Sequence, residues 1–139
     1  MSEFIALFTR ASKLMRSAAD AAMSRHGVRV GQNLLIDELT AEDGLTPGEL
    51  AQRLGVTTPT IVKMATRMET AGLLRRARDP KDARLVRIYL TDKARAAHGP
   101  VEDERLRIQE QALTGFSDAE RRAIESALAR VIRNLEDAG

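Results

Sequence analysis

Apolar residues recur at three- and four-residue intervals over most of the chain, which is the spacing of one face of an α-helix. The pattern predicts helices over residues 3–25, 30–42, 49–54, 58–71, 92–113 and 117–136. Leu34, Leu35 and Leu39 are expected to face inward on the second helix. Gly99 and Pro100 predict a kink or a break within the fifth, because proline lacks the N–H that continues helical hydrogen bonding.

Capping signals define the helices in the middle of the chain. Thr46, Pro47 and Glu49 form a helix start in which threonine is the N-cap and glutamate follows it by three residues. Residues 55–57 then make a glycine-containing turn before the helix that begins at Thr58. Two helices joined by such a short turn are typical of a helix-turn-helix unit.

The pattern changes from helix to strand after Gly72. Residues 73–77 and 85–90 are predicted to be short strands, and the second has a β-branched and aromatic centre. The charged loop between them, residues 78–84, contains an Asp-Pro turn signal. Two strands directly after a helix-turn-helix predict a wing. The expected fold is therefore mainly α with a small β-wing (α+β).

The charge of the chain is concentrated in this middle region. The 139 residues carry 22 basic and 20 acidic side chains, a net charge of +2, and 43% of the residues are hydrophobic, enough for one domain of ordinary size. Residues 57–95 hold ten basic and four acidic side chains, so this window has a net charge of +6 and the remainder −4. A concentrated positive charge favours a polyanion such as DNA as the partner, although a solvated charged face is the alternative.

Composition also excludes several classes of function. Without cysteine the chain has no disulfide, thiolate metal site or thiol nucleophile. His26 and His98 are too few for a histidine-rich metal site, although either could join carboxylates in a mixed one, and we expect no metal and no cofactor. The motifs G-x-S-x-G, H-E-x-x-H and the P-loop do not occur, so we expect no enzymatic activity.

We expect a cytoplasmic, nucleoid-associated protein with no membrane partner. No apolar run approaches the ~20 residues of a membrane-spanning helix. The first residues lack the basic region and the cleavage site of a secretory signal.

Residues 45–94 resemble the DNA-binding core of the MarR family of bacterial transcription regulators. The motif that carries most weight is Asp79-Pro80-Lys81-Asp82-Ala83-Arg84, which matches the D-x-x-D-x-R pattern of the family's wing. The resemblance implies a homodimer in which helices from residues 1–28 and 92–139 intertwine, while residues 29–91 carry the winged helix-turn-helix lobe of one continuous domain. The apolar terminal helices agree with a dimer, and the alternative is that they pack on each other within a monomer.

The residues expected to contact DNA come from the second helix of the helix-turn-helix and from the wing. With Ile61, Met64, Ala65 and Met68 inward, the outward residues of the recognition helix and its start are Thr57, Thr58, Pro59, Thr60, Val62, Lys63, Thr66 and Arg67. In the wing, Arg84 matches the family's minor-groove arginine, and Asp82 matches the acid that holds it. Arg75, Arg78 and Lys81 are expected to bind phosphates. Arg76 and Arg87 could bind phosphates or act as structural partners within the wing.

The predicted function is a ligand-responsive repressor that binds a pseudo-palindromic double-stranded operator. The resemblance implies a small organic anion as a possible effector, with Arg10, Lys13, Arg16 and His26 as candidate ligand residues. Two alternatives remain for these: the basic side chains could merely solvate a helix face or pair with acids such as Asp37 and Glu38, and His26 could simply cap its helix. Activation instead of repression, and a winged helix that binds protein rather than DNA, also remain open.

Overall fold

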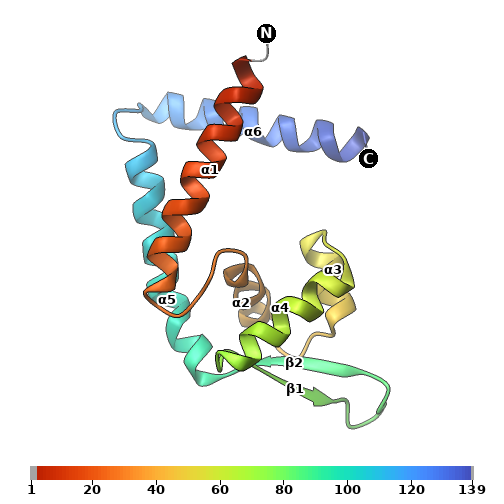
Figure 1. Ribbon diagram of the computed structural model, residues 1–139. Helices are drawn as coiled ribbons and strands as arrows, with labels where there is room; N and C mark the ends of the chain where they lie inside the picture. Colours follow the sequence, from red (N-terminus) through yellow and green to blue (C-terminus); the bar gives the residue numbers. More distant parts are fainter. Residues whose placement is uncertain (1–2, 139) are drawn as a thin grey trace.

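The structure, a computed structural model, describes residues 3–138 and is mainly α with a small β-wing, as predicted (Figure 1). The expected dimerisation segments also include residues 1–2 and 139, which lie outside the described residues. The elements in chain order are α1 Glu3–Ser24, α2 Gln32–Ala41, α3 Pro47–Leu54, α4 Thr58–Thr70, β1 Leu74–Arg78, β2 Val86–Leu90, α5 Asp92–Ala112 and α6 Asp118–Ala138. Within this part of the chain, no helix is both long and apolar enough to cross a bilayer.

The predicted capping residues set the helix starts. Thr46 accepts a hydrogen bond from the backbone N–H of Glu49 at 3.2 Å, and the Glu49 carboxylate accepts one from the backbone N–H of Thr46 at 3.2 Å. Ser117 and Glu120 make the same reciprocal pair at the start of α6. Each box satisfies N–H groups that a helix start otherwise leaves without partners.

The wing is a two-stranded antiparallel sheet in which Leu74 pairs with Leu90 and Arg78 pairs with Val86. A backbone bridge from Leu45 to Ile88 joins this sheet to the segment between α2 and α3. Leu45 and Ile88 are both buried, so the wing is packed onto the helix-turn-helix and is not a free hairpin.

The hydrophobic core lies inside the winged lobe and at its junction with α1 and α5. Residues from every element except α6 contribute to it, and the largest fully buried side chains include Met23, Leu35, Ile36, Leu50, Ile61, Met68 and Ile88. The prediction for α2 was wrong at one position, because Leu34 is 44% exposed and Ile36 is buried in its place. Leu35, Ile36 and Leu39 face the neighbouring helices and β2, whereas Leu34 lies about 100° further around the helix from Leu35.

The two terminal helices leave most of their apolar residues uncovered within the chain. α1 packs against α5 near its C-terminal end, where Ala22 and Met23 are buried, but its first four turns are exposed. α6 lies at the opposite end of the molecule from the wing and buries no residue; Ile132 is 56% and Leu135 is 70% exposed (Figure 1). The terminal helices therefore do not bury each other within one chain.

α5 continues through Gly99 and Pro100 without a break. The helix lacks one backbone hydrogen bond at Pro100, because proline has no N–H to donate. Burial of Ala94, Ala97 and Val101 against the lobe keeps both sides of the proline helical.

Gly44 lies in the loop between α2 and α3, next to β2 of the wing, in a backbone conformation that few other residues adopt. Its φ is +75°, and a Cβ at this position would lie 2.9 Å from Cε1 of Tyr89. Its N–H donates to the Ile88 carbonyl, and its own carbonyl accepts from Arg87.

Replacing Gly44 by alanine should therefore destabilise the fold by about 2 kcal/mol, because positive φ and the close Tyr89 ring both oppose a Cβ. Gly48→Ala is the matched control, since Gly48 lies in the first turn of α3 and a Cβ there would meet only Thr46 Oγ1, at 4.0 Å. Urea denaturation measures both. Equal stability of the two variants would contradict this account of Gly44.

Candidate nucleic-acid interface

The recognition helix α4 presents a polar and basic face to solvent. Ile61, Ala65 and Met68 are buried and Met64 is partly buried, which fixes the rotation of the helix. All eight residues that were predicted to face DNA from this helix and its start are exposed: Thr57, Thr58, Pro59, Thr60, Val62, Lys63, Thr66 and Arg67. The predicted surface is therefore continuous along one side of α4.

Three of the four threonine hydroxyls on this surface are already engaged, whereas two cations have no carboxylate partner. Thr57 and Thr60 bond each other at 2.9 Å while Thr57 caps the helix, and the Thr66 hydroxyl donates to the Val62 carbonyl. Within residues 3–138, neither Lys63 nor Arg67 has a carboxylate within ion-pair distance. These two side chains are the ones on α4 that can meet an incoming anion without first losing a partner.

Asp79 organises the wing loop. Its Oδ1 accepts the backbone N–H groups of Lys81 and Asp82, and its Oδ2 accepts Nε of Arg87 at 2.6 Å. Arg87 also donates to the Gly44 carbonyl at 2.9 Å, which ties the loop to the segment after α2. The ion pair with Arg87 holds the pKa of the Asp79 carboxyl below its usual value. The sequence indicated only a turn at Asp79 and Pro80 and not these contacts, although the place of Asp79 in the D-x-x-D-x-R pattern is a usable signal.

Asp82 holds Arg84 at the tip of the wing, as predicted. One carboxylate oxygen accepts both the backbone N–H and Nε of Arg84 at 3.1 Å, and the other lies 3.3 Å from Nη2. The Arg84 side chain is nevertheless 91% exposed. Asp82 therefore limits the rotamers of a guanidinium that stays accessible, which lowers the entropy lost on binding.

The other wing arginines divide into structural and free groups. Arg87 pairs with Asp79, so it is a structural partner within the wing, whereas Arg76 pairs at 2.9 Å with Glu69 of α4 and joins the wing to the recognition helix. Arg78 donates to the Ala83 carbonyl at 2.6 Å and braces the loop. Arg75 stacks 4.5 Å from the Tyr89 ring centre, with its charge still exposed.

A groove of about 820 Å³ lies between α1 and the recognition helix. Five cations line it, Lys13 and Arg16 from α1, Arg29 from the following loop, and Lys63 and Arg67 from α4, against one acid, Asp20. Met64 and Val30 supply apolar wall. The groove thus has the charge to hold a small anion, and it shares two cations with the predicted DNA surface.

Asp20 anchors the loop at the edge of this groove. Its two oxygens accept Nε and Nη2 of Arg29, both at 2.8 Å, and one also accepts the backbone N–H of Val30. These bonds lower the pKa of Asp20 from 3.8 to about 2. Sequence reasoning missed Asp20 and Arg29, since a contact across nine residues around a turn leaves no periodic signal.

Two of the four predicted ligand residues do not lie in the groove. Arg10 is not among its lining residues, being almost two turns before Arg16 on α1. His26 faces α5, where its buried Nε2 lies 3.5 Å from Glu104 without forming a hydrogen bond, so its side chain lies outside the groove. Asp37 contacts His98 and Arg105, and Glu38 contacts Arg53, so the α1 cations do not pair with these two acids. Lys13 and Arg16 are exposed, as the alternative of a solvated helix face requires.

The helix-turn-helix, the antiparallel wing and the long flanking helices together define a winged helix-turn-helix protein. A sequence profile described as the MarR family matches residues 26–85. The chain is 36% identical over 107 residues to the HTH-type transcriptional regulator TtmR of Methylorubrum extorquens, covering 77% of this chain but only 54% of TtmR. It is 32% identical over 101 residues to the transcriptional regulator AdcR of Streptococcus pneumoniae, covering 70% of this chain and 69% of AdcR. The chain therefore belongs to the MarR family of transcription regulators.

Solved structures agree on the fold. The PcaV transcriptional regulator from Streptomyces coelicolor superposes with a TM-score of 0.86 at 24% identity, covering 98% of this chain and 99% of PcaV. PcaV was also solved in complex with its natural ligand, and that structure gives a TM-score of 0.82 at 23% identity, covering 95% of this chain and 93% of PcaV.

The low pKa of Asp20 predicts how its contribution to stability depends on pH. A carboxyl whose pKa is lower in the folded than in the unfolded state stabilises the fold above the unfolded value, and this stabilisation is lost as pH falls towards about 2. Asp20→Asn should therefore be less stable than the wild type near neutral pH, with the difference shrinking below about pH 4. Denaturation at a series of pH values measures this.

Asp103→Asn is the control, since Asp103 is exposed and has no ion pair among the described residues. Identical pH dependence of stability in both variants would contradict the role of Asp20.

Proposed function

We propose that this MarR-family regulator binds a pseudo-palindromic DNA operator as a homodimer and acts as a repressor that releases DNA when a small organic anion binds. One observation supports DNA binding most strongly. Lys63 and Arg67 lie without carboxylate partners on the exposed face of α4, and the same lobe carries Arg84, exposed and oriented by Asp82, at the wing tip. A protein-binding winged helix, the alternative, has no need of such a surface.

The recognition helix would read the major groove. Lys63 can donate to guanine O6 or N7, and Val62 and the threonine methyl groups can contact thymine methyls. Thr58 lies at the helix start, where its backbone N–H suits a phosphate. Because the hydroxyls of Thr57, Thr60 and Thr66 already have partners, Lys63 and Arg67 would contribute most of the hydrogen bonds from α4.

The wing would place Arg84 in the minor groove, where a narrow A·T-rich segment concentrates negative potential. Arg75, Arg78 and Lys81 would bind phosphates on either side and position the lobe without specifying sequence. Asp79 would act indirectly, since it fixes the loop on which Asp82 and Arg84 stand.

A homodimer accounts for the exposed terminal helices. The apolar residues of α1 and α6 form large uncovered faces, including Phe4, Ile5, Leu7, Ile132 and Leu135, and a second copy would cover them. Residues 1–28 and 92–139 would then form the dimer, with the lobe of residues 29–91 on each side. Two-fold symmetry would set the recognition helices about 34 Å apart, one turn of DNA.

Ligand response would operate through the groove between α1 and α4. An anion bound there would draw Lys63 and Arg67 towards Lys13 and Arg16 and so compete with DNA for the same side chains. The complex of PcaV with its natural ligand is consistent with ligand binding in this fold. By linkage, DNA should weaken ligand binding by the factor by which ligand weakens DNA binding.

DNA binding is tested on duplexes selected by the full chain from a random library. Arg84→Ala should lower affinity by about tenfold or more and relax preference at the minor-groove positions, since a lost base contact costs about 1–3 kcal/mol. Lys81→Ala, in the same loop, should weaken all duplexes alike and reduce the salt dependence of binding. Fluorescence anisotropy at several salt concentrations measures both. The minor-groove assignment fails if Arg84→Ala stays within about twofold of wild type while Arg78→Ala abolishes binding.

Ligand binding is tested by calorimetry with benzoate and its hydroxylated derivatives. A compound that releases DNA from the wild type should bind Arg16→Ala at least about tenfold more weakly, because a charge-assisted contact is lost. Arg10→Ala should bind it normally, since Arg10 lies outside the groove. Unchanged affinity in Arg16→Ala would move the ligand site elsewhere and leave the DNA proposal untouched.

A further inference from the structure

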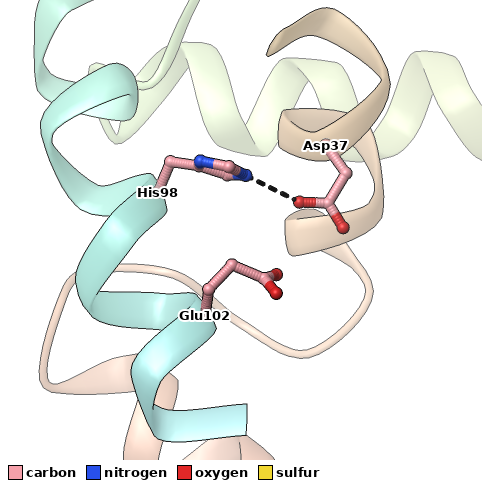
Figure 2. A group of neighbouring side chains, drawn as sticks. All are labelled: Asp37, His98 and Glu102. Atoms are coloured by element: carbon pink, nitrogen blue, oxygen red, sulfur yellow. Dashed lines mark hydrogen bonds and ion pairs between the residues drawn. The ribbon is translucent and has the colours of Figure 1, made fainter. Parts of the chain in front are cut away.

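Three side chains with metal-binding atoms meet between the winged lobe and the long helix α5. Asp37 comes from α2, and His98 and Glu102 come from α5, four residues apart and so on one helix face (Figure 2). One nitrogen or oxygen atom from each residue lies within 4.8 Å of the other two. All three side chains are half-buried, and Nε2 of His98 lies 3.1 Å from Oδ1 of Asp37.

Two carboxylates this close create a demand for a cation. Burial and the neighbouring Glu102 raise the pKa of the Asp37 carboxyl, even though Arg105 and His98 act in the opposite direction. At present a guanidinium meets the demand, because Nη1 of Arg105 lies 2.6 Å from Glu102 and 3.4 Å from Asp37. The Arg105 side chain is 42% exposed, so its guanidinium can turn into solvent when a metal ion replaces it.

We propose that Asp37, His98 and Glu102 form a binding site for a first-row transition-metal dication, best matched by Zn²⁺, for which Arg105 is the competing internal cation. An imidazole nitrogen with two carboxylate oxygens suits Zn²⁺, with water completing four-coordination. Mg²⁺ and Ca²⁺ favour oxygen ligands throughout and fit a site with a histidine less well.

The position of the site gives metal binding a structural consequence. α2 belongs to the winged lobe, whereas α5 runs from the wing along α1 (Figure 1). A metal bonded to both would restrain the lobe relative to the long helices. Because it binds the folded arrangement of three residues from two helices, it would also raise the thermal stability of the chain by mass action. This site is separate from the anion groove, with which it shares no residue.

The site is tested on the metal-free full chain in the absence of DNA, so its outcome does not depend on the proposed operator binding. Titration with Zn²⁺ by calorimetry, and with Co²⁺ by visible absorption, should give one ion per chain. His98→Ala and Glu102→Gln should each weaken binding by about tenfold or more, and circular dichroism confirms that they fold. His26→Gln, which changes the other histidine, should bind normally.

Arg105→Ala separates a metal site from a purely structural ion-pair cluster. Removal of the competing guanidinium should tighten metal binding by about two- to fivefold, the range expected for losing a partly exposed ion pair. No binding by the wild type at a hundred-micromolar Zn²⁺ excess, binding that survives His98→Ala and Glu102→Gln, or a folded Arg105→Ala with no gain in affinity would overturn the proposal.

Discussion

The apolar surface of the terminal helices is the constraint on which the rest of the molecule depends. The core of the winged lobe is closed within one chain, with help from Met23 of α1 and Val101 of α5, and side chains such as Leu35, Leu50 and Ile88 are fully buried. α6, by contrast, buries nothing and exposes Ile132 and Leu135. A small domain can leave scattered apolar side chains in water, but not faces along two helices of more than twenty residues each. In the proposed homodimer a second copy would remove them from water and would thereby determine how far apart two recognition helices stand.

Some ion pairs of the lobe fix the shape of its surface, and they do so without neutralising the cations that stay exposed beside them. Asp79 and Arg87 fix the wing loop to the segment after α2, and Asp82 then orients Arg84 without covering it. On the other side, Asp20 neutralises Arg29 but leaves Lys13 and Arg16 facing the cations of α4 across the groove. In the proposed function DNA and a small anion would compete for Lys63 and Arg67, so that ligand response would need no long conformational relay.

The sequence predicted what depends on local chemistry. Capping boxes, glycine turns and the change from helical to strand period located the elements of the lobe within one or two residues, because each is set by neighbours in the chain. Contacts between distant elements were less predictable. Leu34 and Ile36 are both apolar, and only the position of the neighbouring elements decides which is buried. Likewise, the partner of His26 on α5 and the meeting of Asp37 with His98 are set by how α2 and α5 pack, which no spacing in the sequence encodes.

The most direct test of the account is sedimentation velocity of the full chain, alone and with a selected operator duplex. We predict a dimer of the 15.3 kDa chain at micromolar concentration, two chains on each duplex, and loss of both in Ile132→Glu. Arg133→Glu, which adds a glutamate at the next position, should leave the dimer and its complex intact. A monomer at micromolar concentration that still binds one operator tightly would contradict the claim that the uncovered faces of α1 and α6 organise DNA recognition.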